Sequence, residues 1–110
     1  KKEEAHKWFE TRNFDNLEYM SYAPVVKVDT LPSITHVDGT ARLQTVTEES
    51  HRHFYDLLTE FGKISETNVL LNTSFNIRGY PILSTIEDAL YALNNTDMDC
   101  VVIEDYLFTK

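Results

Sequence analysis

The amino-acid sequence predicts an α/β fold, a twisted mixed β-sheet with helices packed on it. Apolar residues at helical spacing alternate along the chain with short runs rich in β-branched and aromatic residues. Only three Gly and three Pro occur among 110 residues, so no low-complexity linker divides the chain. At 42% hydrophobic residues, a chain of this length suits one globular domain, residues 1–110, with about two-thirds of its unfolded surface buried.

The first half of the chain predicts one helix and two strands. Residues 3–11 place apolar side chains at helical spacing behind two glutamates, which favour a helix N-terminus. Residues 19–28 are rich in aromatic and β-branched residues and predict a strand, in which Pro24 indicates an edge or a bulge. Residues 29–39 predict a loop with an Asp-Gly turn signal. Residues 41–46 alternate as a second strand.

The middle of the chain predicts a second helix and a buried strand. Thr47 is the expected N-cap of the helix, which runs through Phe61 and ends at Gly62. Residues 69–72 are mostly apolar and predict a short, fully buried strand. The expected buried stripe of the helix consists of Phe54, Leu57, Leu58 and Phe61.

The last third predicts another helix between short strands. Residues 82–83 are a candidate strand, and Ser84 with Glu87 forms a capping box for the helix that follows. Residues 99–103 predict the last clear strand, with a short extension through Phe108. The expected inward face of the helix consists of Ile86, Ala89, Leu90 and Leu93.

Composition excludes several classes of function. The net charge of −8 disfavours nucleic acid, because a polyanion requires clustered Lys and Arg and the ten basic residues here are scattered among eighteen acidic ones. No apolar run is long enough to span a membrane. The single cysteine, Cys100, forms no internal disulfide and no cysteine-based metal site, which fits a cytoplasmic protein.

Two polar segments are the candidates for a ligand site. In Leu70–Gly79, an apolar run ends in amides and hydroxyls followed by Arg78, and such a polar loop after a buried strand often binds ligands. An Asn/Ser-rich turn that satisfies its own backbone is the alternative. The second segment, Thr35–Arg42, contains Arg42, which shares a predicted strand face with Gln44. A solvated surface arginine is again the alternative for Arg42 and Arg78.

The two segments also carry a family resemblance. Thr35–Val46, with the sequence THVDGTARLQTV, resembles a signature of the C-terminal domain of nodulation-type O-carbamoyltransferases. Leu70–Gly79, Pro81–Ile82 and the helix start Thr85–Leu90 resemble the same domain, and the similarity extends through Val101–Leu107. The two long motifs occur in the same order and at the same separation as in the family, which makes the resemblance specific.

The resemblance implies a two-domain enzyme. The family's N-terminal domain resembles the sugar-kinase/actin type and transfers the carbamoyl group to a hydroxyl of the acceptor. Its C-terminal domain resembles the YrdC fold and converts carbamoyl phosphate and ATP, which Mg²⁺ would accompany, to carbamoyl-adenylate. This chain corresponds to the C-terminal portion of that second domain. The N-terminal transfer domain is then its expected partner, and no metal site is expected in the chain itself.

The resemblance also assigns binding residues, although it assigns no catalytic residue. Arg42 matches the arginine on the phosphate side, and Ser74 and Asn76 match a Ser-x-Asn pair around the carbamoyl group or α-phosphate. Asn72 is expected beside them and more often fixes the loop. Secondary candidates are His36, for which a structural hydrogen bond is favoured, Asp38, Thr40, Gln44, Thr73 and Arg78.

The chain departs from the family pattern in one respect. The basic stretch expected before the first helix is absent. The 110 residues alone are therefore expected to be inactive, because each charge-assisted hydrogen bond missing from a phosphate clamp costs about 1.5–3 kcal/mol. A non-catalytic docking or scaffold fragment is the alternative reading.

Overall fold

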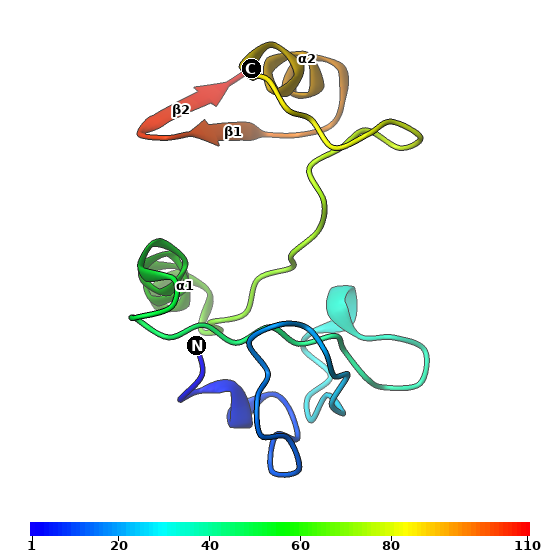
Figure 1. Cartoon of the computed structure of the whole chain (residues 1–110), viewed down its shortest axis with the longest axis vertical. Coiled ribbons are helices and arrows are strands. Elements are labelled where there is room, and N and C mark those ends of the chain that lie inside the picture. Colours follow the sequence, from blue (N-terminus) through cyan, green and yellow to red (C-terminus); the bar gives the residue numbers. More distant parts are fainter. The chain divides into compact units, whose positions relative to one another are not determined.

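A computed structural model describes all residues, 1–110. The chain divides into two compact units, Lys1–Leu71 and Asn72–Lys110, which Figure 1 shows as its blue-to-green and yellow-to-red parts. Each unit is described by itself. That residues 1–110 form one domain stays a prediction. Neither of the two α-helices combines the length and apolar character that crossing a bilayer requires.

The expected helix over residues 3–11 is reduced to a single 3₁₀ turn, η1 (Ala5–Lys7). The chain leaves the helical path because Phe9 forms an antiparallel bridge with Val26. Two backbone hydrogen bonds flank this bridge, Glu10 N–H to Val25 O at 2.9 Å and Lys27 N–H to Trp8 O at 2.8 Å. Tertiary pairing therefore overrides the helical spacing of the apolar residues.

The two strands predicted for residues 19–28 and 41–46 meet only at one bridge, between Val25 and Thr40. Adjacent backbone bonds run from Val26 N–H to the oxygen of Gly39 at 2.9 Å, and from Ala41 N–H to the oxygen of Pro24 at 3.0 Å. Pro24 has no N–H to donate to Ala41, so no regular strand pair forms there, although the Leu43 amide still donates to the oxygen of Tyr22 at 3.4 Å. The prediction of two regular strands was wrong, although the segments do pair. The loop between them contains a second 3₁₀ turn, η2 (Pro32–Ile34).

The core of the first unit forms around Trp8, Phe9 and Ala41, which are all buried. Half-buried apolar side chains from the neighbouring segments pack against these three: Val26, Val28, Leu31, Ile34, Leu43 and Val69. Thr45 is also buried, and its hydroxyl is the one buried side-chain polar atom of the chain without a hydrogen-bond partner.

The helix of the first unit, α1 (Arg52–Ser65), begins five residues after the predicted cap. Thr47 and Ser50 form a separate turn, in which the Thr47 amide donates to the Ser50 hydroxyl at 3.0 Å and the Ser50 amide donates to the Thr47 hydroxyl at 3.1 Å. The helix continues through Gly62 and ends where Glu66 adopts a left-handed conformation, with φ of 61°. The prediction of an end at Gly62 was therefore wrong.

The predicted buried stripe of α1 is also corrected. No residue of α1 is buried. Leu58 and Phe61 are half-buried, whereas Phe54 and Leu57 are 59% and 51% exposed. Amphipathic spacing identifies an apolar face but does not supply the surface that covers it.

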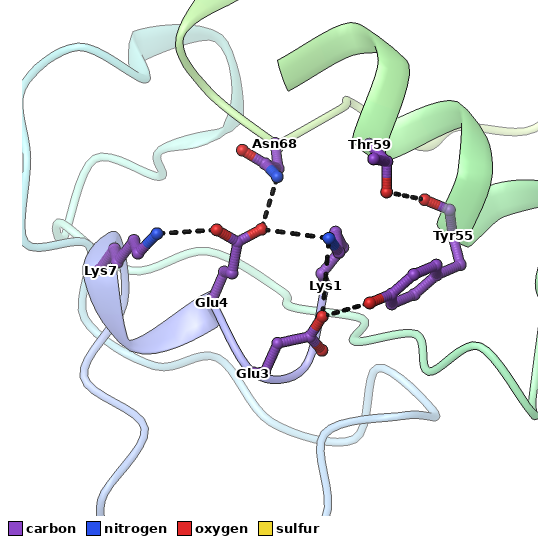
Figure 2. A network of polar contacts seen from close by, with 7 residues as sticks. All are labelled: Lys1, Glu3, Glu4, Lys7, Tyr55, Thr59 and Asn68. Atoms are coloured by element: carbon purple, nitrogen blue, oxygen red, sulfur yellow. Dashed lines mark hydrogen bonds and ion pairs between the residues drawn. The ribbon is translucent and has the colours of Figure 1, made fainter. Parts of the chain in front are cut away.

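A polar network fastens α1 and the segment after it to the start of the chain (Figure 2). The Tyr55 hydroxyl donates to Glu3 at 2.6 Å, and the Asn68 side-chain amide donates to Glu4 at 2.5 Å. Lys7 donates to the other oxygen of Glu4 at 2.7 Å, and this contact, with Lys1 at 3.5 Å, holds the pKa of Glu4 below its ordinary value.

The second unit contains the helix α2 (Ile86–Asn95) and an antiparallel pair of strands, β1 (Cys100–Ile103) and β2 (Tyr106–Thr109). Cys100 pairs with Thr109 and Ile103 with Tyr106 in this hairpin. The expected extension through Phe108 is thus a strand of its own. It follows a turn that contains Glu104, a residue with φ of 53°.

Helix α2 starts one residue later than the predicted capping box requires. Thr85, not Ser84, is the N-cap, and its hydroxyl accepts from the Asp88 amide at 3.1 Å. Ala89 and Leu93 are buried against Val101 of β1, as expected. Ile86 belongs to the predicted inward face but is 54% exposed.

Residues 69–72 and 82–83 adopt no regular strand. A strand needs a neighbour for its N–H and C=O groups, and the only ladder in the chain is the β1–β2 hairpin. Two helices and one antiparallel sheet confirm a mixed α/β fold. Within this chain, a two-stranded hairpin stands in place of the larger twisted mixed sheet that the sequence predicted.

Candidate functional site

The first polar segment forms a tight hairpin turn that satisfies its own polar groups. The backbone of His36 bonds to Gly39 at 2.9 Å and to Thr40 at 2.7 Å, which closes a three-residue loop. Asp38 accepts from the Thr40 hydroxyl at 2.7 Å and from its amide at 3.0 Å, and these bonds lower the pKa of the Asp38 carboxyl.

The ring of His36 also takes part in this turn, since its Nδ1 lies 3.1 Å from the Thr40 hydroxyl. The structure therefore brings together three of the secondary candidates, His36, Asp38 and Thr40. Their side chains bond to one another, which agrees with the structural reading of His36. The turn leads the chain directly into the segment that contains Arg42.

Residues 41–45 keep the alternation that the sequence predicted, although they form no regular strand. Ala41 and Thr45 are buried and Leu43 is half-buried, whereas Arg42 and Gln44 are exposed on the opposite side. The Arg42 guanidinium makes no hydrogen bond and no ion pair within the chain. Its five N–H donors are therefore available to a phosphate or carboxylate.

The second polar segment folds into a loop that is closed by backbone and side-chain bonds. The Leu83 amide donates to the oxygen of Phe75 at 2.9 Å, and the Tyr80 amide donates to the oxygen of Ile77 at 2.9 Å. Gly79 occupies the third position of this inner turn with φ of 84°, a conformation that a side chain disfavours.

The side chain of Asn76 holds this loop together. Its side-chain amide donates to Tyr80 O at 3.1 Å and to Ile77 O at 3.3 Å, so both donors hold the turn. The side-chain oxygen of Asn76 takes no part in these two bonds. Sequence reasoning placed Asn76 at a ligand, and the structure adds a role in holding the loop.

The other polar residues of the segment are exposed. The hydroxyls of Thr73 and Ser74 and the guanidinium of Arg78 have no partner within the chain. Asn72, the last residue of the predicted buried strand, is exposed. The loop therefore leaves Thr73, Ser74 and Arg78 exposed to solvent, while Asn76 fixes its shape.

Arg42 lies in the first compact unit, and Ser74 and Asn76 lie in the second. That they share one site stays a prediction. No group of three or more His, Cys, Asp or Glu side chains lies close enough to hold a metal ion.

Sequence reasoning missed the polar network of Figure 2. The spacing of Glu4 and Lys7 is a visible i, i+3 signal, but Asn68 lies 64 positions from Glu4 and no local pattern connects them. The network fixes Asn68 near the end of the first unit.

Comparisons with known proteins identify relatives of this chain. The Synechocystis protein sll1178 is 48% identical over 73% of this chain and 13% of its own length. The nodulation protein NolO of Bradyrhizobium diazoefficiens is 37% identical over 98% of this chain and 20% of its own. The 3'-hydroxymethylcephem-O-carbamoyltransferase of Amycolatopsis lactamdurans is 32% identical over 84% of this chain and 18% of its own.

The chain therefore spans a fifth or less of the length of these relatives. The family described as "Carbamoyltransferase C-terminus" matches residues 1–110, which is the whole chain. The family match and the relatives thus agree with the family resemblance of the sequence. This chain belongs to the carbamoyltransferase C-terminus family.

Proposed function

We propose that this chain is part of an O-carbamoyltransferase and contributes to a site at which carbamoyl phosphate and ATP form carbamoyl-adenylate. The acceptor hydroxyl then takes the carbamoyl group and AMP leaves. The observation that carries the proposal is the Arg42 guanidinium, which is exposed and unpaired within a segment that resembles the family signature. A guanidinium group without a hydrogen-bond partner in the chain is suited to bind phosphate through its planar set of N–H donors.

The reaction requires positioning and charge stabilisation more than acid–base groups. A carbamate oxygen forms a bond to the α-phosphorus of ATP, the α–β bridging bond breaks, and pyrophosphate leaves. The carbamate arises when water cleaves carbamoyl phosphate and releases inorganic phosphate. Negative charge spreads over the phosphoryl oxygens in the transition state, where guanidinium, hydroxyl and amide donors stabilise it.

The residues present supply these groups. Arg42 would neutralise phosphate oxygens, and Ser74 would donate to the carbamoyl group or the α-phosphate. Asn76 would hold the loop through its amide and present its oxygen to the carbamoyl nitrogen. Arg78, at the exposed turn of the same loop, is a second anion-binding candidate.

The longer protein would supply what this chain lacks. We propose that it completes a YrdC-like twisted sheet, in which segments 69–72 and 82–83, which form no regular strand in this chain, join neighbouring strands. A sugar-kinase/actin-like domain would carry the acceptor site, and Mg²⁺ would bind together with ATP. We propose a cytoplasmic location for the enzyme, because the substrates are cytoplasmic metabolites and the exposed thiol of Cys100 would stay reduced there.

The test is pyrophosphate release from ATP by the longer protein in the presence of carbamoyl phosphate. Arg42→Ala should lower kcat/KM by about 10- to 150-fold, because a charge-assisted hydrogen bond is worth about 1.5–3 kcal/mol. Arg12→Ala is the matched control, since Arg12 is exposed and bonds only to Glu10. A rate for Arg42→Ala equal to that of the control would overturn the role of Arg42.

The alternative function is a docking or scaffold role without a ligand site. It is favoured by α1, none of whose residues is buried. Under this reading, neither Arg42→Ala nor Ser74→Ala alters pyrophosphate release. Substitutions on the exposed face of α1 would instead impair the enzyme by weakening its assembly.

A further inference from the structure

Helix α1 carries an apolar face that its own unit leaves uncovered. Phe54, Leu57, Phe61 and Ile64 recur at spacings of three, four and three residues, which places them along one side of a helix. Phe54 is 59% exposed, Leu57 51% and Ile64 86%, and Phe61 is half-buried. Large apolar side chains gathered in this way mark an interaction surface more often than isolated ones do.

A different side of α1 attaches it to the first unit. Tyr55 donates from this side to Glu3 at 2.6 Å. A Cβ on Gly62 would lie 2.7 Å from the side-chain oxygen of Asn68, so the Asn68 side chain packs directly on the helix backbone there. The helix is therefore held in place without the use of Leu57 or Ile64, and its apolar face stays available.

The basic residues on the opposite, charged side of α1 are already paired. Arg52 contacts Glu48 at 2.6 Å and Asp56 at 2.9 Å, and Lys63 contacts Glu60 at 2.6 Å. An anionic membrane or a nucleic acid would require unpaired Lys and Arg around the face. The partner that fits is consequently another apolar protein surface.

We propose that this face of α1 is an interdomain docking surface, covered by apolar side chains of the longer enzyme that lie outside these 110 residues. The inference rests on the proposed function only in that the chain is part of a longer protein. Most of the sequence of the relatives lies outside the matched part and could supply such a surface, since this chain spans 13–20% of their length. Interfaces between domains of one chain bury roughly 600–1,500 Å², which a helix face of this size can help to form.

The test is photo-crosslinking in the intact longer protein, with p-benzoylphenylalanine in place of Leu57. The matched control carries the same group in place of Lys63, which lies on the charged side of α1. The Leu57 variant should give one intramolecular crosslink to a peptide outside residues 1–110, identified by mass spectrometry. The Lys63 variant should give no such product.

Three results would overturn the proposal. They are a crosslink from position 57 to residues 72–110, a crosslink to a second copy of the protein, and no protein crosslink at all from position 57. The readout requires no carbamoyl transfer. A failed activity assay with Arg42→Ala would therefore contradict the proposed chemistry and leave the docking result intact.

Discussion

The side-chain amide of Asn68 donates to the carboxylate of Glu4 at 2.5 Å and so joins two residues that lie 64 positions apart. Glu4 also accepts from Lys7 at 2.7 Å, so the contact involves a charged and already oriented acceptor. Asn68 reaches this position only because Gly62 has no side chain. A Cβ there would lie 2.7 Å from the Asn68 side-chain oxygen.

Gly62→Ala is therefore expected to destabilise the protein, although alanine favours helices. The helix gains about 0.8–1.0 kcal/mol from the substitution. The displaced Asn68 loses a hydrogen bond to a charged group worth about 1.5–3 kcal/mol, so the net loss is roughly 1 kcal/mol. Denaturant unfolding measures this change in the free energy of unfolding. As a control, Gly62→Ala in an Asn68→Ala background should become stabilising; a loss of the same size in both backgrounds would contradict the explanation.

Thr45→Val is expected to stabilise the protein. The Thr45 hydroxyl is buried without a partner, and valine has nearly the same shape without the polar group. Removing an unsatisfied buried hydroxyl raises the free energy of unfolding by about 1–3 kcal/mol. Thr40→Val is the matched control and should destabilise, because the Thr40 hydroxyl donates to Asp38 at 2.7 Å. A lower midpoint of thermal unfolding for Thr45→Val would mean that a water molecule bonds to this hydroxyl.

Glu10 is expected to contribute to stability at neutral pH and to lose that contribution in acid. Hydrogen bonds from the Arg12 side chain and amide lower the pKa of Glu10 from 4.5 to about 2. A depressed carboxyl pKa stabilises the fold above the unfolded value, and the stabilisation disappears as the pH falls from about 4.5 to about 2. The ¹³C shift of the Glu10 carboxyl should titrate near the lower value. Arg12→Ala should return the midpoint towards 4.5, and an unchanged midpoint would show that Arg12 is not the cause.

Ser74→Ala is expected to affect substrate use, whereas Asn76→Ala is expected to affect the structure of the loop. The Ser74 hydroxyl has no partner within the chain, so its removal should leave the loop intact. The KM for carbamoyl phosphate should rise roughly 2- to 10-fold. Asn76→Ala removes the bonds to Ile77 O and Tyr80 O, which should speed amide hydrogen exchange in residues 77–83. Steady-state kinetics and exchange measured on both variants separate the two roles. Faster exchange in Ser74→Ala would show that this hydroxyl is structural.

Local patterns predicted the elements whose partners are close in sequence. The helix α2 was found with its inward residues Ala89 and Leu93, and so was the strand that became β1. The alternation around Arg42 also held. Predictions failed where a partner distant in the sequence determines the local structure. Phe9, for example, leaves the expected helix because it pairs with Val26.

For the candidate site, the sequence predicted the polar segments but not how each side chain is used. Asn76 clamps its own loop, and Asp38 is bonded to Thr40, whereas Arg42 and Ser74 are left unpaired. These differences depend on the directions of hydrogen bonds, which residue identity and spacing do not specify.

The sequence by itself determined the family of this protein, its mixed α/β class and the two segments that carry its candidate ligand residues. Those properties follow from local spacing and motif order. Only the tertiary structure decided that Asn68 bonds to Glu4, that Gly62 lies inside α1 and that Leu57 stays exposed. Such contacts join residues far apart in the chain, and their free energy depends on a geometry that no local pattern encodes.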